Sequence, residues 1–166
     1  KNNRYSVYWE DGYSAMDKWK SGIVVLREND IDVWKKYIDR PFNCNVSDNG
    51  TVICNDSTIA SLTYSKSISC RLFAFDKLGN LITDYLLTAN IGDIFLIDIN
   101  GEVTVFNTLY SNTNDANSYF VFSLKTNEVL EQFEDENKEL IKVLIDETTR
   151  KVILKLKGED EFEINF

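Results

Sequence analysis

Aspartates stand at four recurring places in this chain, Asp48, Asp76, Asp98 and Asp146. Two carboxylates that face each other across a substrate could perform the acid–base chemistry of glycoside hydrolysis. Each of these aspartates, however, begins a turn, as Asp48 does before Asn49-Gly50. An aspartate at that place hydrogen-bonds the backbone N–H groups that follow it. We therefore predict that the four carboxylates shape turns, and we assign no catalytic residue.

Other reactive residue types are scarce. The chain has no histidine, which excludes Ser–His and Cys–His nucleophiles and histidine-bound zinc. Its three cysteines lack the C-x-x-C spacing of a thiolate metal site. The polar segment Ser111–Ser118 could offer oxygen ligands, but Asp115 is its only carboxylate, whereas calcium sites use several. We expect no metal and no cofactor.

The cysteines bear on the compartment. Cys44 and Cys54 flank the Asn49-Gly50 turn. With a two-residue turn, paired positions sum to 99, so Cys44 faces Asn55 and the two sulfurs point to opposite faces of the sheet. A three-residue turn would bring the sulfurs within bridging distance. Because the number of cysteines is odd, we predict three buried thiols, with Cys70 the third, in a reducing and hence cytoplasmic location.

These residues belong to a repeat. The segment Val46–Cys54 returns as Leu96–Thr104 and more loosely as Leu144–Ile153. The aspartates in it are 50 (98 − 48) and 48 (146 − 98) residues apart. A second motif, Leu72–Leu81, returns in step as Phe120–Val129. Two motifs that share one period predict a repeated unit of four strands, as in a propeller array.

The repeat predicts an all-β chain whose units contain strands a, b, c and d. The a–b hairpin carries the Asn-Gly turn, and strand c carries the apolar run that ends in Asp76 or Ser123. Projected along the chain, the pattern reads bcd, abcd, abcd, abc, or fourteen strands in roughly three and a half units. Pro41 falls in a d–a connection, where its missing N–H removes no ladder bond. A helix at Ser14–Lys20 is an alternative within the first b–c connection.

We expect one domain, 1–166, with units at about 4–38, 43–88, 91–134 and 140–166. The two motifs, apolar-Asp-x-x-Gly between strands a and b and Phe-Asp-x-x-Gly between c and d, resemble those of the WD40 and quinoprotein-like β-propeller superfamily. The resemblance covers about residues 5–166. Phe75-Asp76 and Phe122-Ser123 stand where a WD40 repeat has Trp-Asp, and no Gly-His precedes strand a. The resemblance implies an architecture and leaves the function open.

Three and a half units leave the closure of the array open. The chain could form a small four-bladed ring, a half-ring whose edges pair with another chain, or a piece of a larger propeller. We rank the second and third arrangements above the first. Exposed, unpaired strand edges at Tyr5–Trp9 and Asp160–Phe166 would favour the third arrangement, a piece of a larger propeller.

The long b–c connections are the best candidates for a binding surface. In a propeller they emerge on the same face as the d–a connections, and long loops on a rigid scaffold commonly bind partners. Tyr, Trp and Arg are also frequent in interface hot spots. A competing interpretation is that the aromatic side chains only cover strand ends. The candidate partner-binding residues are Tyr13, Trp19, Arg40, Tyr64, Lys66, Asn90, Tyr110 and Asn112.

The net charge limits the classes of partner that we expect. With 18 basic and 27 acidic residues, the net charge is −9, whereas binding to nucleic acid draws on clustered Lys and Arg. We predict a non-catalytic module that binds a protein partner, with association of copies through open sheet edges as a further prediction, and no binding to nucleic acid or membrane. Two alternatives are an enzyme or ligand-binding domain that uses carboxylates in a central channel, and a structural piece of a larger propeller.

Overall fold

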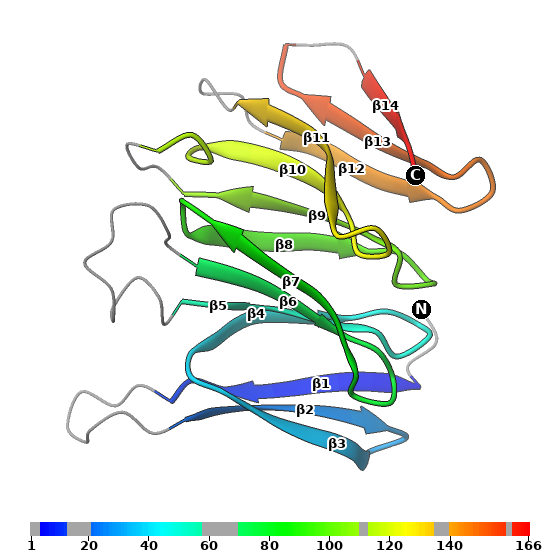
Figure 1. The fold of residues 1–166 in the computed structure, drawn as a ribbon. Helices are drawn as coiled ribbons and strands as arrows, with labels where there is room; N and C mark the ends of the chain where they lie inside the picture. Colours follow the sequence, from blue (N-terminus) through cyan, green and yellow to red (C-terminus); the bar gives the residue numbers. More distant parts are fainter. Residues whose placement is uncertain (1–3, 13–20, 58–69, 110–112, 135–139, 159–160) are drawn as a thin grey trace.

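The computed structural model describes residues 4–12, 21–57, 70–109, 113–134, 140–158 and 161–166. In these ranges every regular element is a β-strand, and the strands form four antiparallel sheets that follow one another in a row (Figure 1). No helix in the described ranges has the length and hydrophobicity to cross a membrane. The strands are β1 (Tyr5–Glu10), β2 (Gly22–Glu28) and β3 (Ile31–Ile38) in sheet A; β4 (Pro41–Val46), β5 (Val52–Asp56), β6 (Cys70–Phe75) and β7 (Leu81–Leu87) in sheet B; β8 (Ile91–Ile97), β9 (Val103–Thr108), β10 (Ser118–Ser123) and β11 (Glu128–Glu134) in sheet C; and β12 (Leu140–Asp146), β13 (Lys151–Leu156) and β14 (Glu161–Asn165) in sheet D.

The predicted all-β repeat is confirmed. Sheet A has three strands in the order bcd, sheets B and C have four, and sheet D has three in the order abc. Each strand pairs with its neighbours in the chain, so every sheet is a meander of hairpins. The segment Ser14–Lys20, considered as a helix, lies outside the described residues.

The a–b hairpin of sheet B has a longer turn than the sequence predicted. The N–H of Gly50 donates to the Ser47 carbonyl at 3.1 Å, and Gly50 has a φ of 89°. Asn49 is absent from the residues with positive φ, so the expected two-residue turn with positive φ at both positions is wrong. A β-turn followed by a glycine in the left-handed region closes the hairpin instead. The loop between Ser47 and Thr51 therefore holds three residues.

This turn changes the pairing of the cysteines. Val46 pairs with Val52, so positions near the turn sum to 98 and Cys44 lies opposite Cys54. The two residues form a disulfide, with a Cα–Cα distance of 4.2 Å. The prediction of three free thiols is thus wrong for this pair, while Cys70 is free and buried as expected. The cytoplasmic location, which rested on free thiols, stays a prediction.

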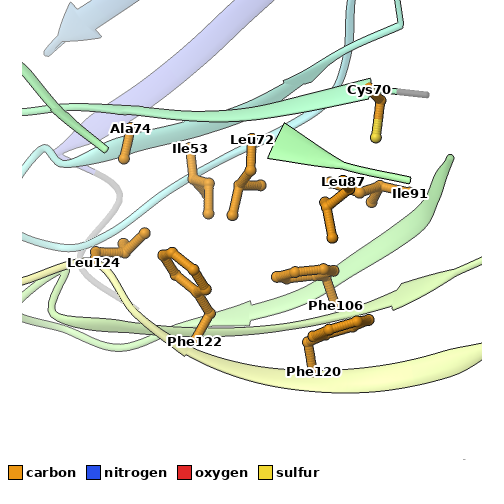
Figure 2. Close-up of a cluster of buried hydrophobic side chains, with 10 residues drawn as sticks. All are labelled: Ile53, Cys70, Leu72, Ala74, Leu87, Ile91, Phe106, Phe120, Phe122 and Leu124. Carbon is orange, nitrogen blue, oxygen red and sulfur yellow. The ribbon is translucent and has the colours of Figure 1, made fainter. Parts of the chain in front are cut away.

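Three apolar clusters hold the row together, one between each pair of adjacent sheets. Because side chains alternate along a strand, sheets B and C are covered on both faces. In β9, Phe106 packs toward sheet B whereas Val103 and Val105 pack toward sheet D. Figure 2 shows the cluster between sheets B and C, where the rings of Phe106 and Phe120 stack at 5.0 Å. Burial of these faces is what stacks the units.

The row is open. β1, β4, β8 and β12 pack beside one another in that order, and sheets A and D lie at opposite ends of the row (Figure 1). A closed four-bladed ring is therefore not formed. Sheet A lacks strand a and sheet D lacks strand d, so each end sheet has one face that no other sheet of the described chain covers.

Candidate interaction surface

The turn aspartates serve their own hairpins. The Asp76 carboxylate accepts the N–H groups of Leu78 and Asn80, each at 2.8 Å. Asp146 accepts the N–H of Thr148 at 2.9 Å. Partial burial raises the pKa of Asp76, but the hydrogen bonds outweigh it and the pKa lies below its ordinary value. The predicted turn role is confirmed for these carboxylates.

Asp98 is the buried member of the set, with 2% of its surface exposed. It accepts the N–H of Asn100 at 3.2 Å, of Glu102 at 2.6 Å and of Val103 at 2.7 Å. Burial raises the pKa of Asp98 above its ordinary value, although these hydrogen bonds oppose the change. Its carboxylate is occupied by the hairpin, which gives it a structural role.

Asp48 does not have the equivalent role. The N–H of Thr51 donates to the Ser47 hydroxyl at 2.9 Å and to the Asn49 side chain at 3.1 Å. Gly50 bonds the Ser47 carbonyl as Gly101 bonds the Asp98 carbonyl. Ser47 is therefore the structural counterpart of Asp98, at a spacing of 51 (98 − 47). The prediction for Asp48 is wrong by one position.

The strand ends that lead into the b–c and d–a connections lie along one side of the row, and the a–b and c–d hairpins lie along the opposite side (Figure 1). Of the eight candidate partner-binding residues, the structure describes Arg40 and Asn90, which lie in the d–a connections between β3 and β4 and between β7 and β8. The other six lie outside the described residues, and their role stays a prediction: Tyr13, Trp19, Tyr64, Lys66, Tyr110 and Asn112.

The backbone carbonyls of Arg40 and Asn90 accept hydrogen bonds at equivalent places in sheets B and C. The Ser57 N–H donates to the Arg40 carbonyl at 3.2 Å, and the Leu109 N–H donates to the Asn90 carbonyl at 2.7 Å. The Arg40 guanidinium donates to both carboxylate oxygens of Asp11, at 3.1 and 3.3 Å. These contacts fix the d–a connections against the strands. The partner-binding role of Arg40 and Asn90 stays a prediction.

The polar segment 113–118 is also held by internal contacts. Thr88 donates from its N–H and from its hydroxyl to the Asp115 carboxylate, both at 2.7 Å. The Ser118 N–H donates to the Thr108 hydroxyl at 3.1 Å. Within the described ranges, no group of three or more possible metal-ligating residues occurs. The Asp115 carboxylate therefore joins this loop to the d–a connection of sheet B.

Hydrogen bonds and an ion pair join neighbouring sheets along the side of the row that carries the a–b and c–d hairpins. The Asn49 N–H donates to the Ile99 carbonyl at 3.2 Å, which ties sheet B to sheet C. The Ile99 N–H donates to the Glu147 carboxylate at 2.8 Å, and Arg150 pairs with Glu102 at 2.8 Å, which ties sheet C to sheet D. These links join neighbouring sheets through their hairpins.

The surface with the strongest interface character is the outward face of sheet A. Val7, Leu26 and Trp34 pack toward sheet B, and alternation turns their neighbours away from it. An apolar centre of Ile23 and Val25 lies between two exposed tyrosines. We define the outward face by the three cross-strand rows Tyr8–Val25–Lys35, Glu10–Ile23–Tyr37 and Ser6–Arg27–Asp32.

The exposed surface of this face belongs to its tyrosines and charged side chains, because Val25 at its centre is only 4% exposed. Tyr8 is 45% and Tyr37 is 70% exposed. The Arg27 guanidinium lies 5.4 Å from the centre of the Tyr8 ring and donates to Asp32 at 2.8 Å. The Lys35 ammonium lies 5.3 Å from the centre of the Tyr37 ring. An apolar centre with tyrosines and a charged rim is the composition typical of protein interfaces.

The outward face of sheet D, at the other end of the row, carries ion pairs. The central strand of sheet D turns Lys151, Ile153 and Lys155 outward, because Val152 and Leu154 pack toward sheet C. Lys142 pairs with Glu161 at 3.1 Å, and Lys151 pairs with Glu163. Exposed ion pairs keep such a face solvated. The outward face of sheet A was not predicted from the sequence, although the unbroken apolar run Ile23–Leu26 in a half-covered sheet is a signal for it.

No family model and no curated protein matches this chain. Solved structures do match it. The crystal structure of HIRA(644-1017) has a TM-score of 0.62 at 12% identity, and the match covers 97% of this chain and 52% of that one. The β-propeller domain of Cps50 (Swd1) from Myceliophteria thermophila has a TM-score of 0.41 at 8% identity, with 87% and 65% covered. This chain therefore spans about half the length of the HIRA chain. At 12% identity the likeness to HIRA(644-1017) shows the fold alone, a propeller-like array of antiparallel sheets, present here as an open, partial array.

Proposed function

We propose that this protein is a non-catalytic protein-interaction module that docks a second copy of itself through the outward face of sheet A. The observation that carries the proposal is the pair of exposed tyrosines, Tyr8 and Tyr37, on the face of an end sheet that no other described sheet covers. Tyrosine offers a large contact area at a low cost in side-chain entropy.

The charges on this face favour a second copy as the occupant. Lys35 and Arg27 supply positive charge, and Glu10 and Asp32 supply negative charge, on the same nine-residue face. A two-fold contact places one surface patch against the same patch of the partner, so the patch must complement itself. A face that carries both signs meets this requirement, because Lys35 of one copy can approach Glu10 of the other.

The test is the solution mass by light scattering over a concentration range. We expect the wild-type protein to be a dimer at tens of micromolar, and the double variant Tyr8→Ser/Tyr37→Ser to be a monomer. Leu78→Ser is the matched control, because Leu78 is 73% exposed, comparable to Tyr37, but lies in the c–d hairpin of sheet B. It should leave the dimer intact. A wild-type monomer at all concentrations, or a dimer that the tyrosine substitutions leave unchanged, would overturn the proposal.

A second candidate function is a structural part of a larger propeller. The open row of four sheets favours it, since rings usually close to remove exposed edges. In that case the isolated protein is a monomer and sheet A contacts further sheets of propeller type. The same light-scattering series separates the two functions.

A further inference from the structure

The same dipeptide, Asn-Gly, stands in the a–b hairpins of sheets B and C. It is Asn49-Gly50 between β4 and β5, and Asn100-Gly101 between β8 and β9, on the same side of the row (Figure 1). An asparagine before glycine is open to intramolecular attack, because glycine has no side chain to hinder the approach of its backbone nitrogen to the asparagine amide. In both hairpins that nitrogen donates its N–H to a backbone carbonyl at 3.1 Å. The contacts of the two asparagine side chains distinguish the sites.

The Asn49 side chain is held through both polar atoms of its amide. Its Oδ1 accepts the Thr51 N–H at 3.1 Å, the Thr51 hydroxyl at 3.0 Å and the Ser47 hydroxyl. Its Nδ2 donates to the Asn100 carbonyl in sheet C. Asn49 is exposed, but attack by the Gly50 nitrogen requires its amide to rotate away from these partners.

The Asn100 side chain is not held in this way. Asn100 is exposed, and among the described residues its side-chain amide has no hydrogen-bond partner. Its hydrogen bonds are made by the backbone: the Asn100 N–H donates to the Asp98 carboxylate at 3.2 Å, and its carbonyl accepts the Asn49 side chain. The Asn100 amide can therefore rotate toward the Gly101 nitrogen without losing a hydrogen bond of its own.

We propose that Asn100 is a site of spontaneous deamidation, with water as the co-reactant. The Gly101 nitrogen loses its proton to water and bonds to Cγ of Asn100, the Cγ–Nδ2 bond breaks, and Nδ2 takes up a proton and leaves as ammonia. Water then opens the five-membered succinimide ring. Hydrolysis at Cγ gives aspartate. Hydrolysis at the backbone carbonyl carbon gives isoaspartate, in which the main chain runs through Cγ.

The isoaspartate product does not fit this hairpin. Its main chain is longer by one methylene, directly before a glycine so close to Thr51 that a Cβ at Gly101 would overlap the Thr51 side chain. The carbonyl that accepts the Asn49 side chain leaves the main chain and becomes a carboxylate. Deamidation to isoaspartate should therefore break the Asn49–Asn100 link between sheets B and C, whereas the aspartate product keeps the main chain of the hairpin.

The test incubates the purified protein in mildly alkaline buffer, folded and in denaturant. Peptide mass spectrometry locates each conversion, and an isoaspartate methyltransferase assay identifies isoaspartate. For each asparagine, the rate in denaturant divided by the rate in the folded protein removes the effect of the different following residues, Thr51 and Glu102. We expect this ratio to be about tenfold or more larger for Asn49, because the fold holds its side chain by four hydrogen bonds.

Variants test the physical cause. Thr51→Val removes one hydroxyl contact at nearly constant shape and should speed the reaction at Asn49 about two- to tenfold, without changing Asn100. Thr51→Ser keeps a hydroxyl and is the matched control. Asn100→Asp adds the charge without the methylene and should melt close to the wild type, whereas the purified isoaspartate form should melt at a lower temperature.

Three results would overturn the proposal. The first is an equal ratio for the two asparagines. The second is an Asn100 that reacts in denaturant but not in the folded protein. The third is an isoaspartate form that melts with the Asn100→Asp variant. Melting temperatures check the fold of the Thr51 variants, and the comparison of Asn49 with Asn100 in the wild type needs no variant.

Discussion

Gly101 lies against Thr51 across the boundary between sheets C and B, so closely that a Cβ at Gly101 would overlap the Thr51 side chain. Gly101 also has a φ of 70°, which L side chains adopt only with strain. Two independent constraints thus meet at one hairpin, and both require glycine.

Gly101→Ala should therefore destabilise the protein by about 2–4 kcal/mol, the sum of backbone strain and overpacking. Gly158→Ala is the matched control, because Gly158 has a φ of 81° but nothing within 4 Å of its Cβ position. It should cost only the strain, about 1 kcal/mol. Urea unfolding of both variants measures the difference. Equal losses would show that the contact with Thr51 relaxes freely.

The disulfide predicts a labelling pattern. If Cys44 and Cys54 are bonded and Cys70 is free, the unfolded, unreduced protein should take up one alkylating group, and the reduced protein three. The folded protein should take up none, because burial raises the pKa of the Cys70 thiol to about 12. Intact mass spectrometry counts the groups. Three groups without reductant would contradict the bridge and restore the free thiols expected from the sequence.

The same bridge predicts a stability change. Cys44→Ala/Cys54→Ala should lower the free energy of unfolding by about 2–3 kcal/mol, because the bridge restricts the unfolded chain over a short loop. Cys70→Ala is the control, because its effect on the free energy of unfolding should be the same with and without reductant.

A disulfide also persists best in an oxidising compartment. Labelling directly on cell lysis would test the cytoplasmic location.

Asp98 and Asp76 should give stability profiles of opposite sign. The pKa of Asp98 is raised, by burial first, so the folded state holds its proton more tightly and the contribution of Asp98 is lost as pH rises through the folded pKa. The pKa of Asp76 is lowered, so its contribution is present above the ordinary pKa and is lost as pH falls.

The measurement is the free energy of unfolding between pH 3 and 6. Relative to the wild type, Asp98→Asn should gain stability as the pH rises, and Asp76→Asn should lose it. Asp146, whose pKa is lowered chiefly by its hydrogen bond with the Thr149 side chain, should behave like Asp76. If Asp98→Asn, Asp76→Asn and Asp146→Asn all change the free energy of unfolding with the same slope against pH, the burial of Asp98 does not govern its titration.

Phe106 should be the most costly single truncation between sheets B and C. It is fully buried, stacks on Phe120 and lies 6.4 Å from the ring of Phe122. Phe106→Ala should cost about 3–5 kcal/mol, because a cavity forms between two sheets that cannot easily close on it. Leu78→Ala, an exposed control, should change the free energy of unfolding by less than about 0.5 kcal/mol. Calorimetry or denaturant unfolding distinguishes the two.

The strand order was predictable because turn signals and apolar strands recur with one period. The hairpin register was not, because Asn49-Gly50 fits both a two-residue turn and a β-turn followed by glycine. The one extra residue in the longer turn decides whether Cys44 lies opposite Cys54 or Asn55. Ser47 replaces an aspartate in the same role, so an alignment on aspartates misplaced the repeat by one position.

The binding surface was less predictable than the fold. Sequence directs attention to loop aromatics, most of which lie outside the described residues, and the partner-binding role of Arg40 and Asn90 stays a prediction. The outward face of sheet A depends on which sheet has only one neighbour, and that follows from the arrangement in space. Tyr8 and Tyr37 are 29 residues apart (37 − 8) and share one face only because β1 and β3 both pair with β2.

The open row also bears on how the molecule melts. Sheets B and C each have two apolar interfaces, whereas sheets A and D have one. In such a linear array the stability of each unit depends on its neighbours, so heating should free the end sheets before the middle pair and broaden the transition. The Cys44–Cys54 bridge lies within sheet B and does not cross to sheet A. It therefore reinforces the last part to melt and leaves the ends free to separate first.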